Sequence, residues 1–131
     1  MAPADAGYPE DLMYHPEHDW ARIEGETATF GITWYAQDAL GEVVFFDVPD
    51  VGAAVAKGES YAEIESVKAV SDVIAPLSGE IVAVNTTISE KPETLNEDPY
   101  GEGWLLRLRP GNSGDTRNLL SAAEYEKIAT D

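Results

Sequence analysis

Lys68 is the residue whose sequence surroundings most strongly indicate chemistry. It lies between two β-prone runs of similar length, Tyr61–Val67 and Ala69–Ile74. Two strands of about six residues around one central residue place that residue at the tip of a hairpin. An exposed amine is a poor nucleophile and a poor Schiff-base former, since both roles need desolvation, but an enzyme can reach it. The spacing therefore leaves two interpretations, a site of enzymatic modification or a solvated surface lysine, and taken alone it favours the solvated surface lysine.

Three carboxylates lie on the two predicted strands that flank this lysine. Glu63, Glu65 and Asp72 could form a general acid–base pair. Carboxylates on an exposed hairpin are usually solvated, however, and the sequence shows no ordered set of a nucleophile and a base. We therefore expect no catalytic residue in this chain.

The two histidines, His15 and His18, are the remaining candidates for a metal site. Their spacing suits a metal only on a helix, and Pro16 between them argues against a helix. The chain contains no cysteine, which excludes disulfides, Cys-ligated zinc, iron–sulfur clusters and thiol nucleophiles. We expect two structural or surface histidines and no metal site.

Short apolar runs separated by turn residues predict the elements that position these groups. Residues 20–32 predict a hairpin that turns at Gly25. Thr33 is placed to cap a short helix over Trp34–Leu40, and Gly41 is placed to end it.

The rest of the chain continues this alternation of short elements and turns. Val43–Val48 predicts a strand buried on both faces or nearly so, and residues 90–103 predict a polar loop. Ser121-Ala122-Ala123-Glu124 is a capping box for a last helix, with Tyr125 and Ile128 facing inward. Many short strands with frequent turns predict a mainly β fold, an antiparallel sandwich or flattened barrel.

Length and charge restrict the class of protein further. The 131 residues suit one domain over residues 1–131, with a loose N-terminal segment over residues 1–11. Eight basic and 25 acidic residues give a formal charge of −17. A surface this acidic repels phosphate backbones and anionic lipids, so we expect no nucleic acid and no membrane as partner.

The location of the protein is predicted from the absence of targeting patterns. The longest run without a charged residue, Thr27–Gln37, is too short to span a bilayer. Residues 1–11 contain no lysine, no arginine and no apolar core segment, which argues against a signal peptide or an arginine-rich leader. We expect a cytoplasmic protein, or a mature organellar chain as the alternative.

The segment around Lys68 resembles the biotinyl/lipoyl-carrier superfamily, in which a central lysine carries the cofactor. More narrowly, residues 14–128 resemble the H protein family of the glycine cleavage system. Eight blocks match in the right order, which is difficult to obtain by chance. They include His18-Asp19-Trp20, Tyr35-Ala36-Gln37, Leu40-Gly41-Glu42-Val43-Val44, Glu65-Ser66-Val67-Lys68-Ala69 and Asn96-Glu97-Asp98-Pro99-Tyr100-Gly101-Glu102-Gly103-Trp104.

The resemblance implies a fold, a cofactor and a set of partners. The fold is a flattened, lipoyl-domain-like β-barrel or sandwich with short flanking helices, one of them C-terminal. Lipoate is attached in amide linkage to Lys68, and its arm carries the aminomethyl group of glycine. The implied partners are glycine decarboxylase (P protein), the aminomethyltransferase (T protein), dihydrolipoamide dehydrogenase (L protein), and a lipoate ligase or lipoyl/octanoyl transferase. The chain would then be a carrier that is a substrate of these enzymes, not an enzyme itself.

The resemblance also implies a pocket of acidic residues that holds the aminomethyl amine. Motif matching places Glu17, Asp19 and Asp72 in it. This chain departs from the family at two of these positions, because the family more often has Glu at the Asp19 position and can have a small hydroxyl residue at the Glu17 position. Asp19 has a shorter reach, for which Glu17 could compensate.

Two alternative carrier functions remain at this point. The chain could act as a lipoyl relay that donates its lipoyl group to other dehydrogenase complexes. It could also carry biotin, but biotin domains usually place methionine on both sides of the lysine, where this chain has Val67 and Ala69.

Overall fold

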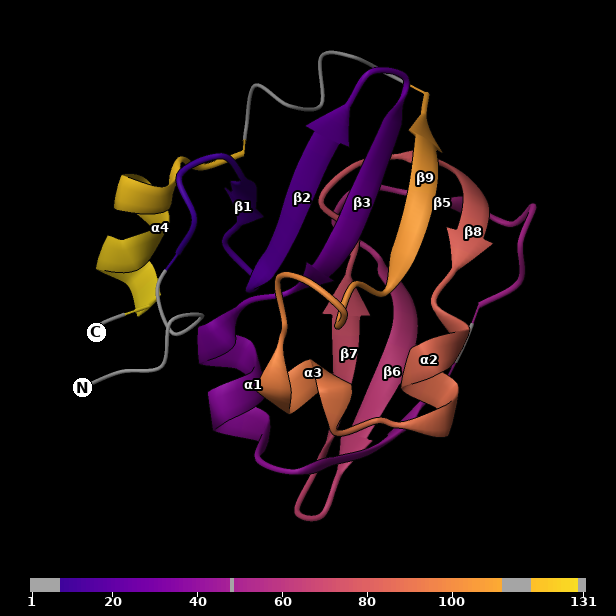
Figure 1. Ribbon diagram of the computed structural model, residues 1–131. Helices are drawn as coiled ribbons and strands as arrows, with labels where there is room; N and C mark the ends of the chain where they lie inside the picture. The colour runs from indigo at the N-terminus through magenta and orange to yellow at the C-terminus, as the bar shows by residue number, and fades with distance from the viewer. Residues whose placement is uncertain (1–7, 48, 112–118, 130–131) are drawn as a thin grey trace.

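The computed structural model describes residues 8–47, 49–111 and 119–129, and most of the segment predicted to be loose, together with Val48, lies outside them. The described residues form nine strands and four helices (Figure 1). The strands are β1 (Met13–His15), β2 (Asp19–Glu24), β3 (Thr27–Ile32), β4 (Val43–Phe46), β5 (Ala54–Val55), β6 (Ser60–Ser66), β7 (Val70–Ile74), β8 (Gly79–Val84) and β9 (Leu106–Pro110). The helices are α1 (Trp34–Leu40), α2 (Thr86–Glu90), α3 (Thr94–Glu97) and α4 (Ala122–Ala129).

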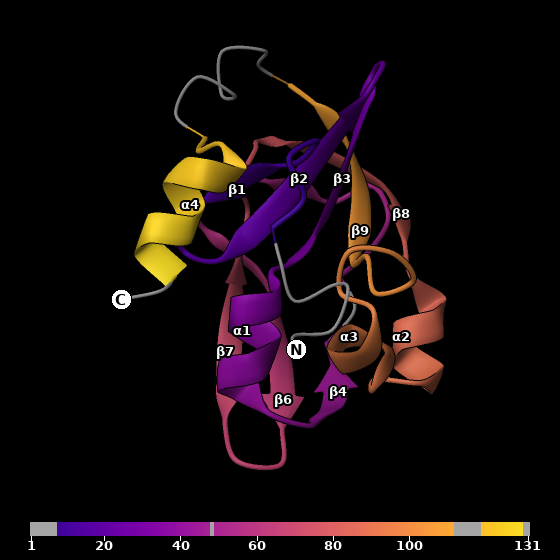
Figure 2. The ribbon, with the colours of Figure 1, turned by 60° about the vertical axis from the view of Figure 1, so that its left-hand side comes forward.

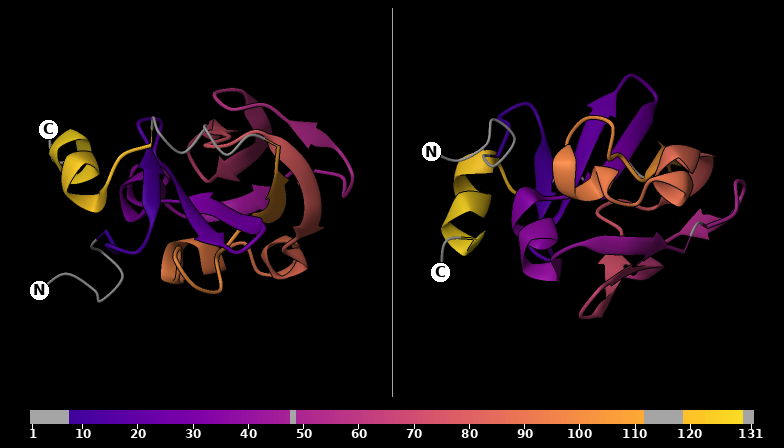
Figure 3. Two further views of the ribbon diagram at one scale, coloured as in Figure 1. Left: turned by 90° about the horizontal axis from the view of Figure 1, so that it is seen from above. Right: turned by 60° about the horizontal axis from the view of Figure 1, so that its bottom comes forward.

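The strands form two antiparallel sheets. The larger sheet has six strands in the order β1-β2-β3-β9-β8-β5, and the smaller has three in the order β4-β6-β7. Helices α1, α2 and α3 lie beside the smaller sheet, whereas α4 lies beside β1 at one end of the molecule (Figures 1 and 3). This arrangement confirms the prediction of a mainly β fold with two sheets and short flanking helices, one of them C-terminal.

The two sheets and the helices enclose three apolar clusters. The first lies among the smaller sheet and α1–α3 and includes Leu40, Ile64 and Leu95. The second lies against the larger sheet. The third contains Tyr14, Trp20 and Tyr125 and attaches α4 to the edge of the larger sheet; the Tyr14 and Tyr125 rings stack with centroids 4.9 Å apart.

The predicted helix ends are confirmed at α1 and α4. The Thr33 side chain accepts a hydrogen bond from the Ala36 amide, and α1 ends at Gly41, whose φ of 81° suits glycine. At α4, Ser121 and Glu124 form the reciprocal capping box, with distances of 2.9 and 3.2 Å.

Three predictions about burial and loops were wrong. In β4, Val43 and Phe46 are buried, but Val44 and Phe45 are exposed, because β4 is an edge strand and a bulge between Val43 and Phe45 breaks the alternation. Ile128 is likewise exposed on α4, where only one side of this short helix packs against the sheet.

The segment 90–103 is not simply a loop, because α3 lies within it and α2 ends at its first residue. Asn85 caps α2 through a hydrogen bond from the Thr87 amide to its side chain. Helix α3 has no side-chain cap, and it buries Leu95 in the first apolar cluster.

The hairpin of β6 and β7 projects away from the rest of the molecule. Its strands pair from Ser60↔Ile74 to Glu65↔Val70, so residues 67–69 form the tip. Figure 2 shows this tip extending beyond α1 and β4. The fold therefore confirms the predicted position of Lys68.

Candidate functional site

The backbone of the hairpin tip is fixed by Ser66. Its hydroxyl oxygen accepts hydrogen bonds from the amides of Lys68 and Ala69, at 3.2 and 3.1 Å, and its own amide donates to the Ala69 carbonyl at 2.8 Å. The Lys68 side chain is exposed. The tip thus presents this amine from a defined turn, although Ser66 itself is buried.

A second segment supports the tip from the side. The Val67 amide donates to the Glu42 carbonyl at 3.0 Å. A Cβ atom at Gly41 would lie 3.4 Å from Lys68 Cε, an ordinary contact distance, so the lysine side chain passes close to the end of α1. Asn96 holds the support in place, since its amide group donates to the Gly41 carbonyl at 2.7 Å and accepts from the Val43 amide at 2.9 Å.

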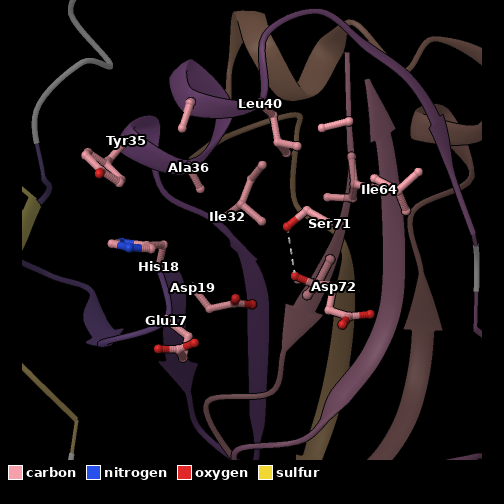
Figure 4. Close-up of a pocket in the computed structure, with 14 residues that line it drawn as sticks. Glu17, His18, Asp19, Ile32, Tyr35, Ala36, Leu40, Ile64, Ser71 and Asp72 are labelled. Atoms are coloured by element: carbon pink, nitrogen blue, oxygen red, sulfur yellow. Dashed lines mark hydrogen bonds between the residues drawn. The ribbon is translucent and has the colours of Figure 1, made fainter. Parts of the chain in front are cut away.

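A cavity of about 310 Å³ begins beside this tip and runs between β7, α1 and the start of β2 (Figure 4). It has apolar walls and a polar end. The lining residues are Glu17, His18, Asp19, Ile32, Tyr35, Ala36, Ala39, Leu40, Ile64, Ala69, Val70, Ser71, Asp72 and Val73. All three residues expected in an acidic pocket, Glu17, Asp19 and Asp72, therefore border one cavity.

Asp19 is the buried carboxylate of this cavity, with only 1% of its surface exposed. The Tyr61 hydroxyl donates a hydrogen bond to its Oδ2 at 3.2 Å. Burial raises the pKa of Asp19 well above its ordinary value, and the hydrogen bonds from Tyr61 and the Ile74 backbone offset only part of that rise. A positive charge that enters the cavity would counteract the effect of burial and favour the ionised carboxylate.

Glu17 and Asp72 occupy different positions around the cavity. Glu17 lies in the turn before β2, two residues before Asp19 in the chain. Asp72 is exposed, lies opposite Glu63 in the β6–β7 pairing, and accepts a hydrogen bond from the Ser60 hydroxyl at 3.2 Å. In Figure 4 its carboxylate points away from those of Glu17 and Asp19. Asp72 is therefore a residue of the cavity rim.

The neighbouring residue Ser71 was missed by the sequence analysis. Ser71 lies opposite Ile64, which is buried and lines the cavity, so strand alternation directs Ser71 and Ile64 to the same face. The alternation of Ser71 with Asp72 was the available signal, because only one of two adjacent strand residues can face inward.

His18 and Tyr125 form a second polar group at the cavity wall. His18 has a φ of 77° and its Nδ1 lies 2.6 Å from the Tyr125 hydroxyl, which also lies 2.7 Å from Thr33 Oγ1. The His18 ring also packs on Tyr35 with centroids 4.6 Å apart. Burial lowers the pKa of His18, which favours the neutral imidazole. The helix α4 is thus connected to the wall of the cavity through one hydroxyl group.

The histidines do not converge on a metal site in the part of the chain that the structure describes. His15 Nδ1 accepts a hydrogen bond from the Glu17 amide at 3.1 Å, and His18 Nδ1 is hydrogen-bonded to the Tyr125 hydroxyl. Among the described residues, no group of three histidine or carboxylate side chains could hold a metal ion. In the same residues, no helix has the length and apolar character that a bilayer crossing requires.

Comparison with known proteins places this chain in a family. Residues 12–131 match the family model described as "Glycine cleavage H-protein". The chain is 56% identical over 122 residues to a protein of Rubrobacter xylanophilus, and 52% identical over 120 residues to one of Thermus thermophilus, both named glycine cleavage system H protein. These matches cover 93% and 92% of this chain and 94% of each relative.

A solved structure gives the same result for the fold. The crystal structure of a glycine cleavage system H protein from Mycobacterium marinum superposes with a TM-score of 0.86 at 43% identity. The superposition covers 94% of this chain and 99% of that chain. Because the superposition covers nearly the whole chain, both sheets and the flanking helices share this lipoyl-domain-like architecture. With nearly its whole length matched in sequence and in fold, the chain belongs to the glycine cleavage H-protein family.

Proposed function

We propose that this chain is the lipoyl carrier of a glycine cleavage system, with lipoate attached to Lys68. The observation that carries the proposal is the position of Lys68, exposed at a hydrogen-bonded hairpin tip and next to the opening of the cavity. Attachment is a condensation: Lys68 Nζ forms an amide bond to the carboxyl carbon of an activated lipoyl group. The activating group leaves with the electron pair of the broken bond, and the ammonium loses its protons to the solvent.

The residues around the tip fit a lipoyl arm. When bound, lipoate supplies the dithiol/disulfide chemistry that this cysteine-free chain lacks. Apolar side chains such as Ile32, Leu40 and Ile64 line the middle of the cavity, where a hydrocarbon arm needs contact, and Glu17 and Asp19 lie at its polar end. An apolar passage that ends in carboxylates suits an arm whose cargo carries an amine.

We propose that Glu17, Asp19 and Asp72 bind that amine. Asp19 is buried and receives a hydrogen bond from Tyr61, so it can form a charge-assisted bond in a nearly dry setting. Glu17 adds a second carboxylate beside it, and Asp72 acts at the rim. A protonated amine has no free lone pair with which to expel a thiolate, so these carboxylates protect the cargo against loss.

The partners and the location follow from the same proposal. The carrier would serve the decarboxylase, the aminomethyltransferase and dihydrolipoamide dehydrogenase as a protein-bound substrate, after a lipoate ligase or lipoyl/octanoyl transferase has modified it. The family match over residues 12–131 supports a single lipoyl-carrier domain, and the bacterial relatives support a cytoplasmic location. The comparisons favour neither the lipoyl relay nor biotin carriage.

The test is acylation of the purified chain by a lipoate ligase with lipoate and ATP, followed by peptide mapping. We expect a single lipoyl adduct at Lys68, with Lys57, Lys91 and Lys127 unmodified. The variant Lys68→Arg should accept no lipoate, because a guanidinium group does not form this amide. Lipoylation of Lys68→Arg, or a biotinyl adduct on protein from the native source, would contradict the proposal.

A further inference from the structure

Tyr61 points into the molecule because of an irregularity in β6. Ala62 is buried and Glu63 is exposed, so regular strand alternation would place Tyr61 on the exposed side with Glu63. The pairing with β7 shifts register between Ser60 and Ala62, which makes Tyr61 the extra residue of a bulge. A bulge can re-aim a side chain, and Tyr61 packs inward against the first and second apolar clusters.

The position of the ring brings the Tyr61 hydroxyl to Asp19. The ring packs on Phe30 of β3 with centroids 5.9 Å apart, and the hydroxyl donates to Asp19 Oδ2 at 3.2 Å. Tyr61 is not among the residues that line the cavity. It can therefore influence an amine in the cavity through Asp19, and not by direct contact.

Asp19 has little other compensation for its charge. It is buried, and its second donor is the backbone amide of Ile74 on β7. No lysine or arginine is among the described residues that line the cavity. The other titratable side chains that line the cavity or act on Asp19 are Glu17, His18, Tyr35, Asp72 and Tyr125. None of them is positively charged while His18 is neutral, the form that burial favours.

We infer that Tyr61 is a positioning residue for the cargo: its hydroxyl fixes the orientation of the Asp19 carboxylate and stabilises its ionised form when the amine enters. This inference rests on the proposed function. A protonated Asp19 can pass its proton to a neutral amine nitrogen, and the electron pair of the broken O–H bond stays on the carboxylate. Hydrogen bonds to a charged acceptor are stronger than those to a neutral one, so the bond from Tyr61 favours this transfer. Burial and Asp19 itself raise the pKa of Tyr61, so the phenol keeps the proton that it donates.

The first test is a titration of the Asp19 carboxyl carbon by NMR in the chain before lipoylation, with Asp19→Asn used to assign the signal. Tyr61→Phe keeps the ring and removes the donor. We expect the midpoint to rise by about one pH unit in Tyr61→Phe, because the ionised form loses a hydrogen bond. The matched control is Tyr14→Phe, which loses a hydroxyl bonded to the Pro9 carbonyl away from the cavity and should leave the midpoint unchanged. The same spectra establish that the variants are folded.

The second test measures how fast the aminomethyl-loaded carrier decays in a double-mutant cycle. Tyr61→Phe should accelerate decay about 3–10 times in the wild-type background, and less than about twofold when Asp19→Asn is already present. An equal acceleration in both backgrounds would overturn the inference, because Tyr61 would then act on the cavity independently of Asp19. An unchanged midpoint in Tyr61→Phe would also overturn it and leave the proposed function intact. Absence of any lipoyl adduct on wild type would instead contradict the proposed function, while the titration would still report on Tyr61 and Asp19.

Discussion

At the scale of single residues, Asp19 links the proposed function to stability. The cavity holds this carboxyl away from water, and the folded chain therefore binds its proton more tightly than the unfolded chain does. Between the pKa of the unfolded state, about 4, and the higher pKa of the folded state, unfolding releases a proton. The contribution of Asp19 to stability consequently falls as the pH rises through this window.

Replacing Asp19 by Asn should remove this dependence. We expect the free energy of unfolding of Asp19→Asn to increase relative to that of wild type as the pH rises from about 4 to about 7. Urea denaturation at several pH values measures the difference. The control is Asp38→Asn, an exposed carboxyl of α1, whose stability curve should run parallel to wild type. A parallel curve for Asp19→Asn would contradict the raised pKa.

The same carboxylate should protect the cargo. In Asp19→Asn the aminomethyl-loaded carrier, separated from its partner enzymes, should decay about 5–30 times faster than wild type, which corresponds to a loss of about 1–2 kcal/mol. In Asp72→Asn the loaded carrier should also decay faster than wild type. The increase should be smaller than in Asp19→Asn, within or below this range, because Asp72 is exposed at the rim. Mass spectrometry of the loaded form gives the lifetimes.

The lipoylation rate serves as the internal control for both variants. It should be unchanged, since attachment takes place at the hairpin tip and not in the cavity. Equal lifetimes in wild type and both variants would mean that these carboxylates do not hold the amine, and the assignment of the pocket would then be wrong.

At the scale of elements, α4 is held to the cavity wall by the Tyr125 hydroxyl. Tyr125→Phe keeps the ring in the third apolar cluster but removes the partner of both His18 Nδ1 and Thr33 Oγ1. Losing the partner of buried polar groups costs about 1–3 kcal/mol. We expect urea denaturation to show a loss of this size.

A neighbouring tyrosine provides the matched control. Tyr14 stacks on Tyr125, but its hydroxyl makes one hydrogen bond, to the Pro9 carbonyl at 2.7 Å. Tyr14→Phe should therefore destabilise the protein less than Tyr125→Phe. Equal effects in the two variants would show that ring packing, and not the shared hydroxyl, attaches α4.

The elements also show where sequence reasoning succeeds and where it stops. Helix ends were predictable at Thr33 and at the Ser121 capping box, because capping depends on side chains within one turn. The outward orientation of Phe45 was not predictable, since it follows from a bulge and from the position of β4 at a sheet edge. Helix α3 carries no capping side chain, and its burial depends on contacts distant in sequence.

For the site, the hairpin depends on local sequence signals, whereas the cavity depends on contacts between residues distant in sequence. The tip position of Lys68 follows from local strand lengths, and motif matching found residues that border the cavity. The contacts between Tyr61 and Asp19, 42 residues apart, and between Tyr125 and His18, 107 apart, could not be read from spacing. Ser71 was missed because motif matching favours charged residues over a neighbouring hydroxyl.

At the scale of the whole molecule, the charge of −17 should govern encounters with partners. Acidic surfaces accelerate association with basic ones, and screening beyond a Debye length of about 8 Å removes this effect at physiological ionic strength. We expect decarboxylase turnover at limiting carrier to fall several-fold between about 20 mM and about 200 mM NaCl, through the association rate.

The point of comparison is turnover at saturating carrier, where association no longer limits the rate and salt should have little effect. A flat response at limiting carrier would mean that the acidic surface does not contribute to docking. A response that is equal at limiting and saturating carrier would indicate an effect of salt on the enzyme itself.

The contact between Tyr125 and His18 has a consequence for the order in which a growing chain acquires its parts. The hydrogen bonds described for the hairpin tip and its support lie between residues 41 and 96, whereas the wall of the cavity needs a hydroxyl from residue 125. Synthesis proceeds from the N-terminus. The residues that present the lysine therefore leave the ribosome before the residue that completes the shelter for its cargo, so a chain that ends before residue 125 has the residues of the attachment point but lacks the hydroxyl of the cavity wall.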